Sequence, residues 1–190
     1  MNTTKTMNLE PKTIENVDAI SSKILQTTQK KLGLIPNMYL GMANNTALLD
    51  GYVSAYNSFR TNSGFSPQEQ EVIFLSIAYE NECEYCMAAH SFVGDNITKV
   101  PTEVTNAIRN NAEIPHEKFK ALSLFSKAIT LKRGLPSETD VDNFLNSGYT
   151  EKHILGVIAA VGIKTMSNYF NHIFNTPVDD AFKSRTWKKK

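Results

Sequence analysis

The sequence has few of the residues that define several common protein classes. Only two of its 190 residues are cysteines, three positions apart, so it cannot build the disulfide framework of a small secreted domain. A CxxC pair in a reducing compartment instead indicates redox or metal chemistry. Neither sign of charge dominates, since 20 basic and 19 acidic residues leave a net charge of +1. This balance gives no general attraction to nucleic acid or to an anionic membrane.

Long apolar runs are also missing. The first ten residues are polar, and the longest uncharged apolar run, residues 154–163, falls well short of the ~20 residues that a membrane span needs. No segment alternates apolar and polar residues as a strand does. We therefore expect one all-α, cytoplasmic domain over residues 1–190 that binds no nucleic acid or membrane. Residues 1–12 should form a flexible lead, and the basic residues 183–190 a solvated tail.

Apolar residues recur at helical spacing along most of the chain. The clearest helix start is Ser66-Pro67-Gln68-Glu69, where Ser66 caps the helix, Pro67 suits the first helical position and Glu69 completes a capping box. The last helix reads as apolar almost all round, and Gly156 and Gly162 should allow close helix contact. Helices are expected at about residues 13–33, 46–60, 66–80, 83–96, 102–109, 119–134, 137–148 and 150–174.

Two short segments match position for position. Residues 63–66 read SGFS and residues 147–150 read SGYT, and each opens a capped helix with a long apolar run. This match predicts a duplicated helical unit, with the two copies offset by 84 residues. At that offset, the chemically distinctive residues of the first unit correspond to ordinary residues in the second. We therefore expect the reactive side chains in the first unit alone. The pairs are Glu71 with Leu155, Cys83 with Ser167, Cys86 with Phe170 and His90 with Phe174.

Residues 71–90 carry the distinctive chemistry of the sequence. On a helix, Cys83, Cys86 and His90 lie three and four positions apart and so form one stripe. One thiol activated by a base, with a second thiol close enough to form a disulfide, can perform dithiol chemistry. Glu71 can orient the imidazole and stabilise its charge. The position of Glu71 also suits the helix macrodipole, which does not separate it from Glu69.

Other interpretations of these residues remain open. Cys83, Cys86 and His90 could hold zinc, although structural zinc normally takes four protein ligands and no second CxxC or HxxxH follows. A structural or interaction module would explain the apolar helices but leaves Glu71 without a role. Tyr85, between the cysteines, either contacts substrate or is a surface aromatic.

The spacing E-x11-CxxC-xxxH, formed by Glu71, Cys83, Cys86 and His90, resembles the signature of the AhpD-like alkylhydroperoxidases in the carboxymuconolactone decarboxylase superfamily. The segment SPQEQEVIFLSIAYENECEYCMAAH is similar to that family throughout. LGLIPNMYL before it and NYFNHIFNTPVDDAF after it resemble the subgroup of peroxidase-related enzymes. The resemblance spans residues 24–182.

This resemblance implies an AhpD-like helical bundle with no cofactor and a role in antioxidant defence. The enzyme would be a thiol peroxidase or disulfide reductase that acts on a small hydroperoxide and is regenerated by a dithiol reductant protein. Cys86 would attack the peroxide, Cys83 would resolve it, and Glu71 and His90 would relay protons. Where well-studied family members have a relay histidine, this chain has Tyr85. Relatives that act on carboxylactones lack the cysteines, so the intact CxxC argues against lyase chemistry.

Three expectations concern the site and the assembly. The helix N-terminus favours the thiolate at Cys83, whereas His90 and the family favour Cys86. We expect an exposed Cys83 to meet the reductant and a deeper Cys86 to meet the peroxide. Glu71→Gln should leave thermal stability nearly unchanged. The apolar helices and the family both predict a symmetric homo-oligomer whose interface includes residues from the N-terminal helices as well as the core helical units.

Overall fold

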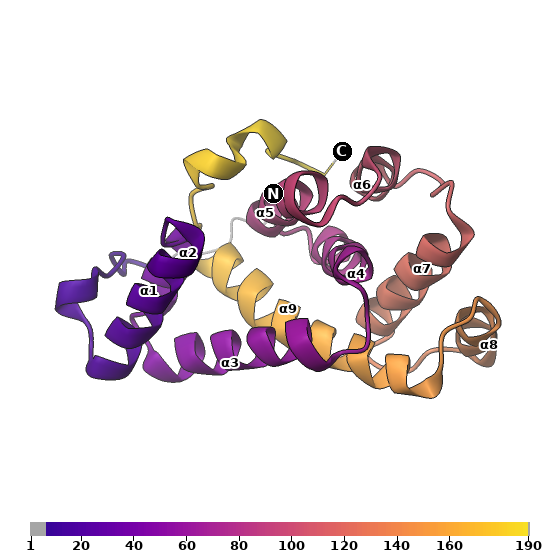
Figure 1. The fold of residues 1–190 in the computed structure, drawn as a ribbon, viewed down its shortest axis with the longest axis horizontal. Coiled ribbons are helices and arrows are strands. Elements are labelled where there is room, and N and C mark those ends of the chain that lie inside the picture. The colour runs from indigo at the N-terminus through magenta and orange to yellow at the C-terminus, as the bar shows by residue number, and fades with distance from the viewer. Residues whose placement is uncertain (1–6, 190) are drawn as a thin grey trace.

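The computed structural model describes residues 7–189, which form helices joined by short loops and contain no strand (Figure 1). The all-α fold class is therefore confirmed. None of the helices in these residues is long and apolar enough to cross a membrane. The α-helices are α1 (Ala19–Leu32), α2 (Asn37–Met42), α3 (Thr46–Asn62), α4 (Pro67–Glu80), α5 (Glu84–Val93), α6 (Thr102–Asn110), α7 (Glu117–Leu131), α8 (Glu138–Asn146) and α9 (Glu151–Phe174).

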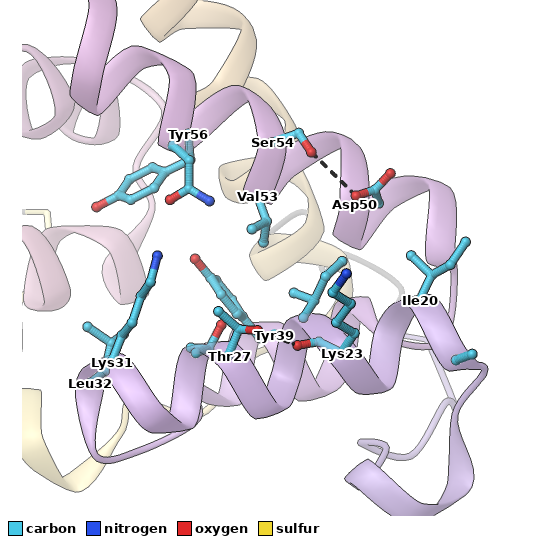
Figure 2. Close-up of a pocket in the computed structure, with 14 residues that line it drawn as sticks. Ile20, Lys23, Thr27, Lys31, Leu32, Tyr39, Asp50, Val53, Ser54 and Tyr56 are labelled. Atoms are coloured by element: carbon cyan, nitrogen blue, oxygen red, sulfur yellow. Dashed lines mark hydrogen bonds between the residues drawn. The ribbon is translucent and has the colours of Figure 1, made fainter.

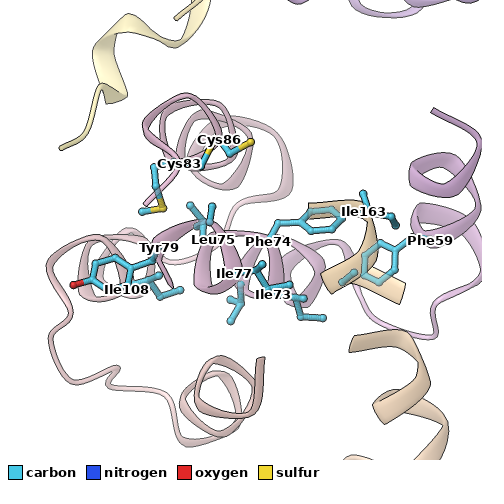
Figure 3. Packing of buried hydrophobic residues seen from close by; sticks show 14 of the residues in the cluster. Phe59, Ile73, Phe74, Leu75, Ile77, Tyr79, Cys83, Cys86, Ile108 and Ile163 are labelled. Atoms are coloured by element: carbon cyan, nitrogen blue, oxygen red, sulfur yellow. The ribbon is translucent and has the colours of Figure 1, made fainter. Parts of the chain in front are cut away.

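Helix α4 is the centre of the molecule. It begins at the predicted cap, where Ser66 and Glu69 form a reciprocal capping box and Pro67 takes the first helical position. Its residues 69–79 are all buried, because α5, α6, α7 and α9 pack around it (Figure 1). A helix that is apolar on every side needs such cover. Figure 3 shows the result, with Leu75 of α4 pointing toward Cys83 and Cys86, Phe74 toward Ile163, and Ile77 to the opposite side of the helix.

A tight turn joins α4 to α5 and places the dithiol. Glu82 has φ +57°, in the left-handed region, and Cys83 is the residue that caps α5. The Cys83 amide still donates to the Ala78 carbonyl at 2.9 Å, so the turn stays attached to α4. The predicted interruption after Glu80 is therefore confirmed. The expected end near Asn96 needs correction, because α5 ends at Val93 and Gly94–Thr98 continues as a π-helical turn.

The N-terminal region differs from the expected single helix over residues 13–33. Ile14–Asn16 form a short 3-10 turn, and α1 starts only after Asp18. The Asp18 carboxylate accepts hydrogen bonds from the amides of Ile20 and Ser21, so it caps a new helix and breaks the apolar pattern before it. Helix α2 has no counterpart among the expected helices, because its six residues are too few to show a helical period.

Both ends of the described chain are attached to the helices at a few points, while residues 7–11, Lys183 and Lys188 are exposed. The flexible lead and the solvated tail therefore stay predictions. The Met7 amide donates to the Ile173 carbonyl at 3.0 Å, and the Lys12 amide donates to the Leu40 carbonyl at 2.9 Å. Residues 1–6 and residue 190 lie outside the described part of the chain. Near the C-terminus, Trp187 Nε1 donates to the Arg109 carbonyl at 2.8 Å, and the Trp187 ring packs 5.6 Å from that of Tyr79.

The two matching segments of the sequence contact each other. The Phe65 ring lies 4.9 Å from the His153 ring, and the Tyr149 hydroxyl donates to Glu69 Oε1 at 3.0 Å. Position 65 corresponds to 149 and position 69 to 153, so these contacts are reciprocal, as in two units related by a local twofold. Beyond the helix starts the units diverge, because α4 ends at Glu80 whereas α9 continues to Phe174.

Candidate functional site

The two cysteines lie at the start of α5 and are both reduced and buried. Cys83 is 0% exposed and Cys86 is 2% exposed. The expectation of an exposed Cys83 is therefore wrong. The turn at Glu82 folds α5 back onto α4, and the end of α9 covers the cysteines from the other side.

Glu71 and His90 form the predicted pair, and α3 adds a third member. His90 Nδ1 lies 2.8 Å from Glu71 Oε2, and Arg60 Nη2 lies 2.5 Å from Glu71 Oε1. Burial alone would raise the pKa of Glu71, but its interactions with His90 and Arg60 outweigh burial and hold that pKa below its ordinary value. Arg60 was missed from sequence because a basic residue in the last turn of a helix already suits the macrodipole.

The structure also distinguishes the roles of Glu69 and Glu71, which the sequence alone could not do. Glu69 caps α4, accepts from Tyr149 at 3.0 Å and pairs with Lys118 at 3.1 Å. Glu71 is fully buried and points to the site. Glu69 is therefore structural, and Glu71 is the site residue.

A polar stripe on α9 completes the site. Lys164, Ser167, Asn168 and Asn171 recur at spacings of three, one and three residues, which is one face of a helix, and all four are buried. The Asn171 side-chain amide donates to Cys86 Sγ at 3.4 Å and approaches Cys83 Sγ at 3.7 Å. Cys86 Sγ lies 3.9 Å from the Ser167 hydroxyl.

This stripe overturns the expectation that only the first helical unit carries the chemistry. It also corrects the interpretation of α9 as apolar almost all round and of Ser167 as an ordinary residue of the second unit. A signal is present in the sequence, because polar residues recur at helical spacing within an otherwise apolar run. Nothing in the sequence says which helix such a stripe faces.

Lys164 is the most unusual member of the stripe. It is 0% exposed, and its Nζ has no hydrogen-bond partner among the described residues. The ammonium lies 5.4 Å from the Phe74 ring centroid, and that ring lies 4.9 Å from the ring of His90. Lys164 therefore sits in the same buried cluster as Glu71, His90 and Cys86.

The environment distinguishes the two thiols. Burial raises the pKa of Cys83 well above its ordinary value, and the neighbouring Cys86 adds to this. Burial opposes the thiolate at Cys86 as well, but a hydrogen bond from Cys83 and the charge of Lys164 outweigh it and bring the pKa of Cys86 well below its ordinary value. The environment therefore favours the thiolate at Cys86, against the helix-terminus argument for Cys83.

His90 is neutral at physiological pH. Burial lowers its pKa, and the nearby Lys164 ammonium lowers it further, against the opposing effect of Glu71. The ionised Glu71 can only accept a hydrogen bond, so Nδ1 of His90 carries the single ring proton. His90 Nε2 is therefore free to accept a proton.

Tyr85 occupies a structural position. Its hydroxyl donates to Asp179 Oδ2 at 2.6 Å within the core, and the other Asp179 oxygen accepts from the Asn37 amide at 3.0 Å. Burial and the Asp179 charge raise the pKa of Tyr85. The phenol thus ties α5 to the segment after α9, so the interpretation as a surface aromatic is wrong. Its one hydrogen bond directs it to Asp179 and not to the Glu71–His90 pair.

Two hollows lead toward the site. A polar one of about 640 Å³ lies between the α4–α5 turn and the end of α9, and Cys83 and Asn171 line it. A larger groove of about 670 Å³ lies between α1 and α3, with Tyr39 and Tyr56 in its lining (Figure 2). The Tyr56 hydroxyl accepts from Arg60 at 2.6 Å, so this groove borders the Glu71 side of the site.

A zinc site at these residues is not supported by the geometry. Among residues 7–189, no three His, Cys, Asp or Glu side chains are grouped so that they could hold a metal ion. His90 Nδ1 faces Glu71. The remaining histidines lie outside the site. His153, for example, takes part in the capping box at the start of α9.

Comparison with solved structures identifies the architecture. An AhpD-core peroxidase-related protein from Ralstonia eutropha JMP134 superimposes with a TM-score of 0.83 at 19% identity, covering 95% of this chain and 97% of the other. The chain has the AhpD fold. A peroxidase-related protein from Silicibacter sp. TM1040 shares the AhpD fold with a TM-score of 0.79 at 19% identity, covering 96% and 95%.

A third structure with the AhpD fold is that of a debrominase. The debrominase Bmp8 gives a TM-score of 0.77 at 15% identity, covering 95% of this chain and 96% of Bmp8. A cysteine-to-alanine variant of Bmp8 was solved in complex with 2,3,4-tribromopyrrole. No family model and no curated protein matches the sequence. At these identities the shared AhpD fold leaves the reaction to be argued from the site.

Proposed function

We propose that the protein is a thiol-dependent peroxidase or disulfide reductase of the AhpD type, which reduces hydroperoxides in antioxidant defence. One observation carries this proposal: a single side-chain amide, that of Asn171, lies within 3.4 Å of Cys86 Sγ and 3.7 Å of Cys83 Sγ. The two sulfurs are thus held together, and only Cys86 has its pKa lowered. That is the asymmetry which a two-cysteine peroxidase needs.

The reaction proceeds in two oxidative steps. The Cys86 thiolate attacks the terminal oxygen of the hydroperoxide, the O–O bond breaks, and the alkoxide takes a proton and leaves as an alcohol. Cys86 is now a sulfenic acid. The Cys83 thiol attacks that sulfur, forming the disulfide and expelling water. A dithiol reductant protein then supplies two electrons and two protons to restore both thiols, reaching Cys83 through the polar hollow that it lines.

Glu71, His90 and Arg60 serve the second step. Cys83 must lose its proton to attack, and its raised pKa makes this costly without a base. His90 Nε2 accepts protons because Glu71 holds the ring in the tautomer with its proton on Nδ1. Arg60 keeps Glu71 ionised, so that the carboxylate can stabilise the imidazolium as it forms.

A second candidate is reductive debromination of a small aromatic ring, favoured by the fold shared with Bmp8. Here the Cys86 thiolate would take the bromine, the ring carbon would take a proton, and Cys83 would displace bromide to give the same disulfide. Both reactions consume the same two thiols, so substrate turnover separates them. An assay with cumene hydroperoxide and with 2,3,4-tribromopyrrole, in the presence of a dithiol reductant, assigns the activity.

Titration of thiols tests the shared dithiol step. One equivalent of cumene hydroperoxide should remove both free thiols of the reduced protein, counted after acid quenching and unfolding in guanidinium. Cys83→Ser should lose its one remaining thiol as a sulfenic acid that dimedone traps, and Cys86→Ser should keep its thiol. Two free thiols in the oxidant-treated wild type would refute the dithiol mechanism.

A further inference from the structure

The charges of the buried cluster do not balance unless Cys86 is an anion. Arg60 and Glu71 neutralise each other at 2.5 Å, and His90 is neutral. Lys164 then remains as an ammonium that is 0% exposed. Among residues 7–189, no carboxylate lies within hydrogen-bond distance of its Nζ. An unpaired charge in such a position is strongly disfavoured.

The buried carboxylates around the dithiol, Glu71 and Asp179, already have partners. Glu71 binds Arg60 and His90, and Asp179 accepts from Tyr85 and from the Asn37 amide. The two thiols are the other groups near Lys164 that can become negative, and Cys86 is the one that contacts Ser167 on the same face of α9. Lys164 lies one helical turn before Ser167 on the facing helix, so it can reach the same sulfur that Ser167 and Asn171 contact.

We propose that Lys164 is the counter-ion of the Cys86 thiolate and the proton donor to the alkoxide that leaves the hydroperoxide. This rests on the proposed peroxidase function. As Cys86 Sγ bonds to the terminal oxygen and the O–O bond breaks, the proton passes from Lys164 Nζ to the leaving oxygen. The pair of thiolate and ammonium becomes a sulfenic acid, a neutral amine and an alcohol.

This transfer keeps the cluster electrically neutral throughout the oxidation. The negative charge of Cys86 and the positive charge of Lys164 disappear together, so no isolated charge remains when the disulfide forms. His90 is poorly suited to this step, because it is neutral and its one ring proton is directed at Glu71. Lys164 and His90 therefore have separate tasks, Lys164 as acid for the first sulfur and His90 as base for the second.

The counter-ion role is tested on the reduced protein without any peroxide. The ultraviolet absorbance of the thiolate, followed between about pH 4 and pH 8 with Cys86→Ser as the blank, reports the ionisation of Cys86. Lys164→Met should move the midpoint to higher pH by about 2 units, since it removes a buried positive charge. Lys164→Arg keeps the charge and should keep the midpoint near that of the wild type. Lys152→Met, at an exposed position of the same helix, is the control.

The acid role is tested by the rate of Cys86 oxidation. Arginine stays charged and does not give up its proton, so Lys164→Arg should form the thiolate but react at least about 10-fold more slowly with tert-butyl hydroperoxide than the wild type does. An unchanged rate in Lys164→Arg would overturn the acid role. An unchanged thiolate midpoint in Lys164→Met would overturn the counter-ion role. If Lys164→Met does not fold, the test passes to Lys164→Arg, and a folded Lys164→Arg protein without a thiolate would overturn the same role. Failure of the peroxidase function itself would give a different result. The wild-type protein would then show the proposed thiolate titration but would not be oxidised by hydroperoxide.

Discussion

Each carboxylate oxygen of Glu71 binds a different side chain, and these two contacts set the charge of Glu71 and the tautomer of His90. Oε1 binds Arg60 from α3, and Oε2 binds His90 from α5. The carboxylate is fully buried, so its charge is tolerated only because both partners are present. Glu71 therefore supports stability as well as the tautomer of His90.

Replacing this charge should destabilise the protein, in contrast to the expectation from sequence. Glu71→Gln leaves Arg60 partly buried and unpaired, and breaking a buried pair costs about 3–5 kcal/mol. Because the Arg60 side chain is 20% exposed, we expect a lower loss of about 2–3 kcal/mol. Urea unfolding of the reduced protein at neutral pH measures it. Asp142→Asn, at an exposed position of α8, is the control, and equal unfolding free energies in the two variants would contradict the prediction.

Sequence could identify the site residues that lie close together in the chain and could not identify those that lie far away. Cys83, Cys86 and His90 share a stripe of one helix, so their spacing is itself the signal. Asn171 reaches both sulfurs from almost the other end of the chain, through the packing of α9 against α5, and Lys164 enters the buried cluster from the same helix. Tertiary packing of that kind leaves no mark in local spacing.

At the scale of elements, the two central glycines of α9 have different surroundings. A Cβ at Gly156 would lie 2.8 Å from the Phe65 ring and 3.2 Å from the Ser63 carbonyl oxygen. A Cβ at Gly162 would meet no atom within 4 Å. The expected close contact is thus confirmed at Gly156, whereas Gly162 lies in open space in the described chain.

This contrast gives a paired prediction on one helix. Gly162→Ala should stabilise the protein by about 0.5–1 kcal/mol, because alanine is the better helix former and nothing obstructs it. Gly156→Ala should instead destabilise it by about 1–3 kcal/mol, since the added methyl group must displace a buried ring and approach a backbone oxygen. Thermal unfolding of both variants beside the wild type measures the two effects. A gain in stability from both substitutions would contradict the packing described for Gly156.

Helix ends are predictable where a capping side chain stands beside an apolar run. Ser66 and Ser137 both accept the expected backbone hydrogen bonds at the starts of α4 and α8. Asp18 does the same for α1, yet apolar residues on both sides of it continue the helical period and hide the break. A cap within a continuous pattern is visible only once the backbone around it is known.

At the scale of the whole molecule, α9 leaves an apolar stripe uncovered. Leu155, Ile158, Tyr169 and Ile173 lie along one side of this helix and are all exposed, with Leu155 at 67%. A continuous apolar surface along a helix of 24 residues is characteristic of an interface. The predicted homo-oligomer therefore has a candidate contact surface, and it stays a prediction.

We expect the protein to exceed the 21.2 kDa mass of one chain in light scattering at micromolar concentration. The double variant Leu155→Glu and Ile158→Glu should return it to the monomer mass, because burying two carboxylates in an apolar contact is strongly unfavourable. Leu135→Glu changes a residue that is 80% exposed outside this stripe and should leave the mass unchanged. A wild type of monomer mass would mean that the stripe stays in contact with water.

The supply of site residues from α9 also has a consequence during synthesis. Cys86 leaves the ribosome about 80 residues before Lys164, which at about 5–20 residues per second is an interval of roughly 4–16 s. For that time the nascent chain carries both thiols without the ammonium and the amide that later surround them. Cys86 then has the ordinary reactivity of an exposed cysteine, so its nucleophilic character appears only when α9 docks. The chain thus acquires its reactive thiol last, after the helices that enclose it are complete.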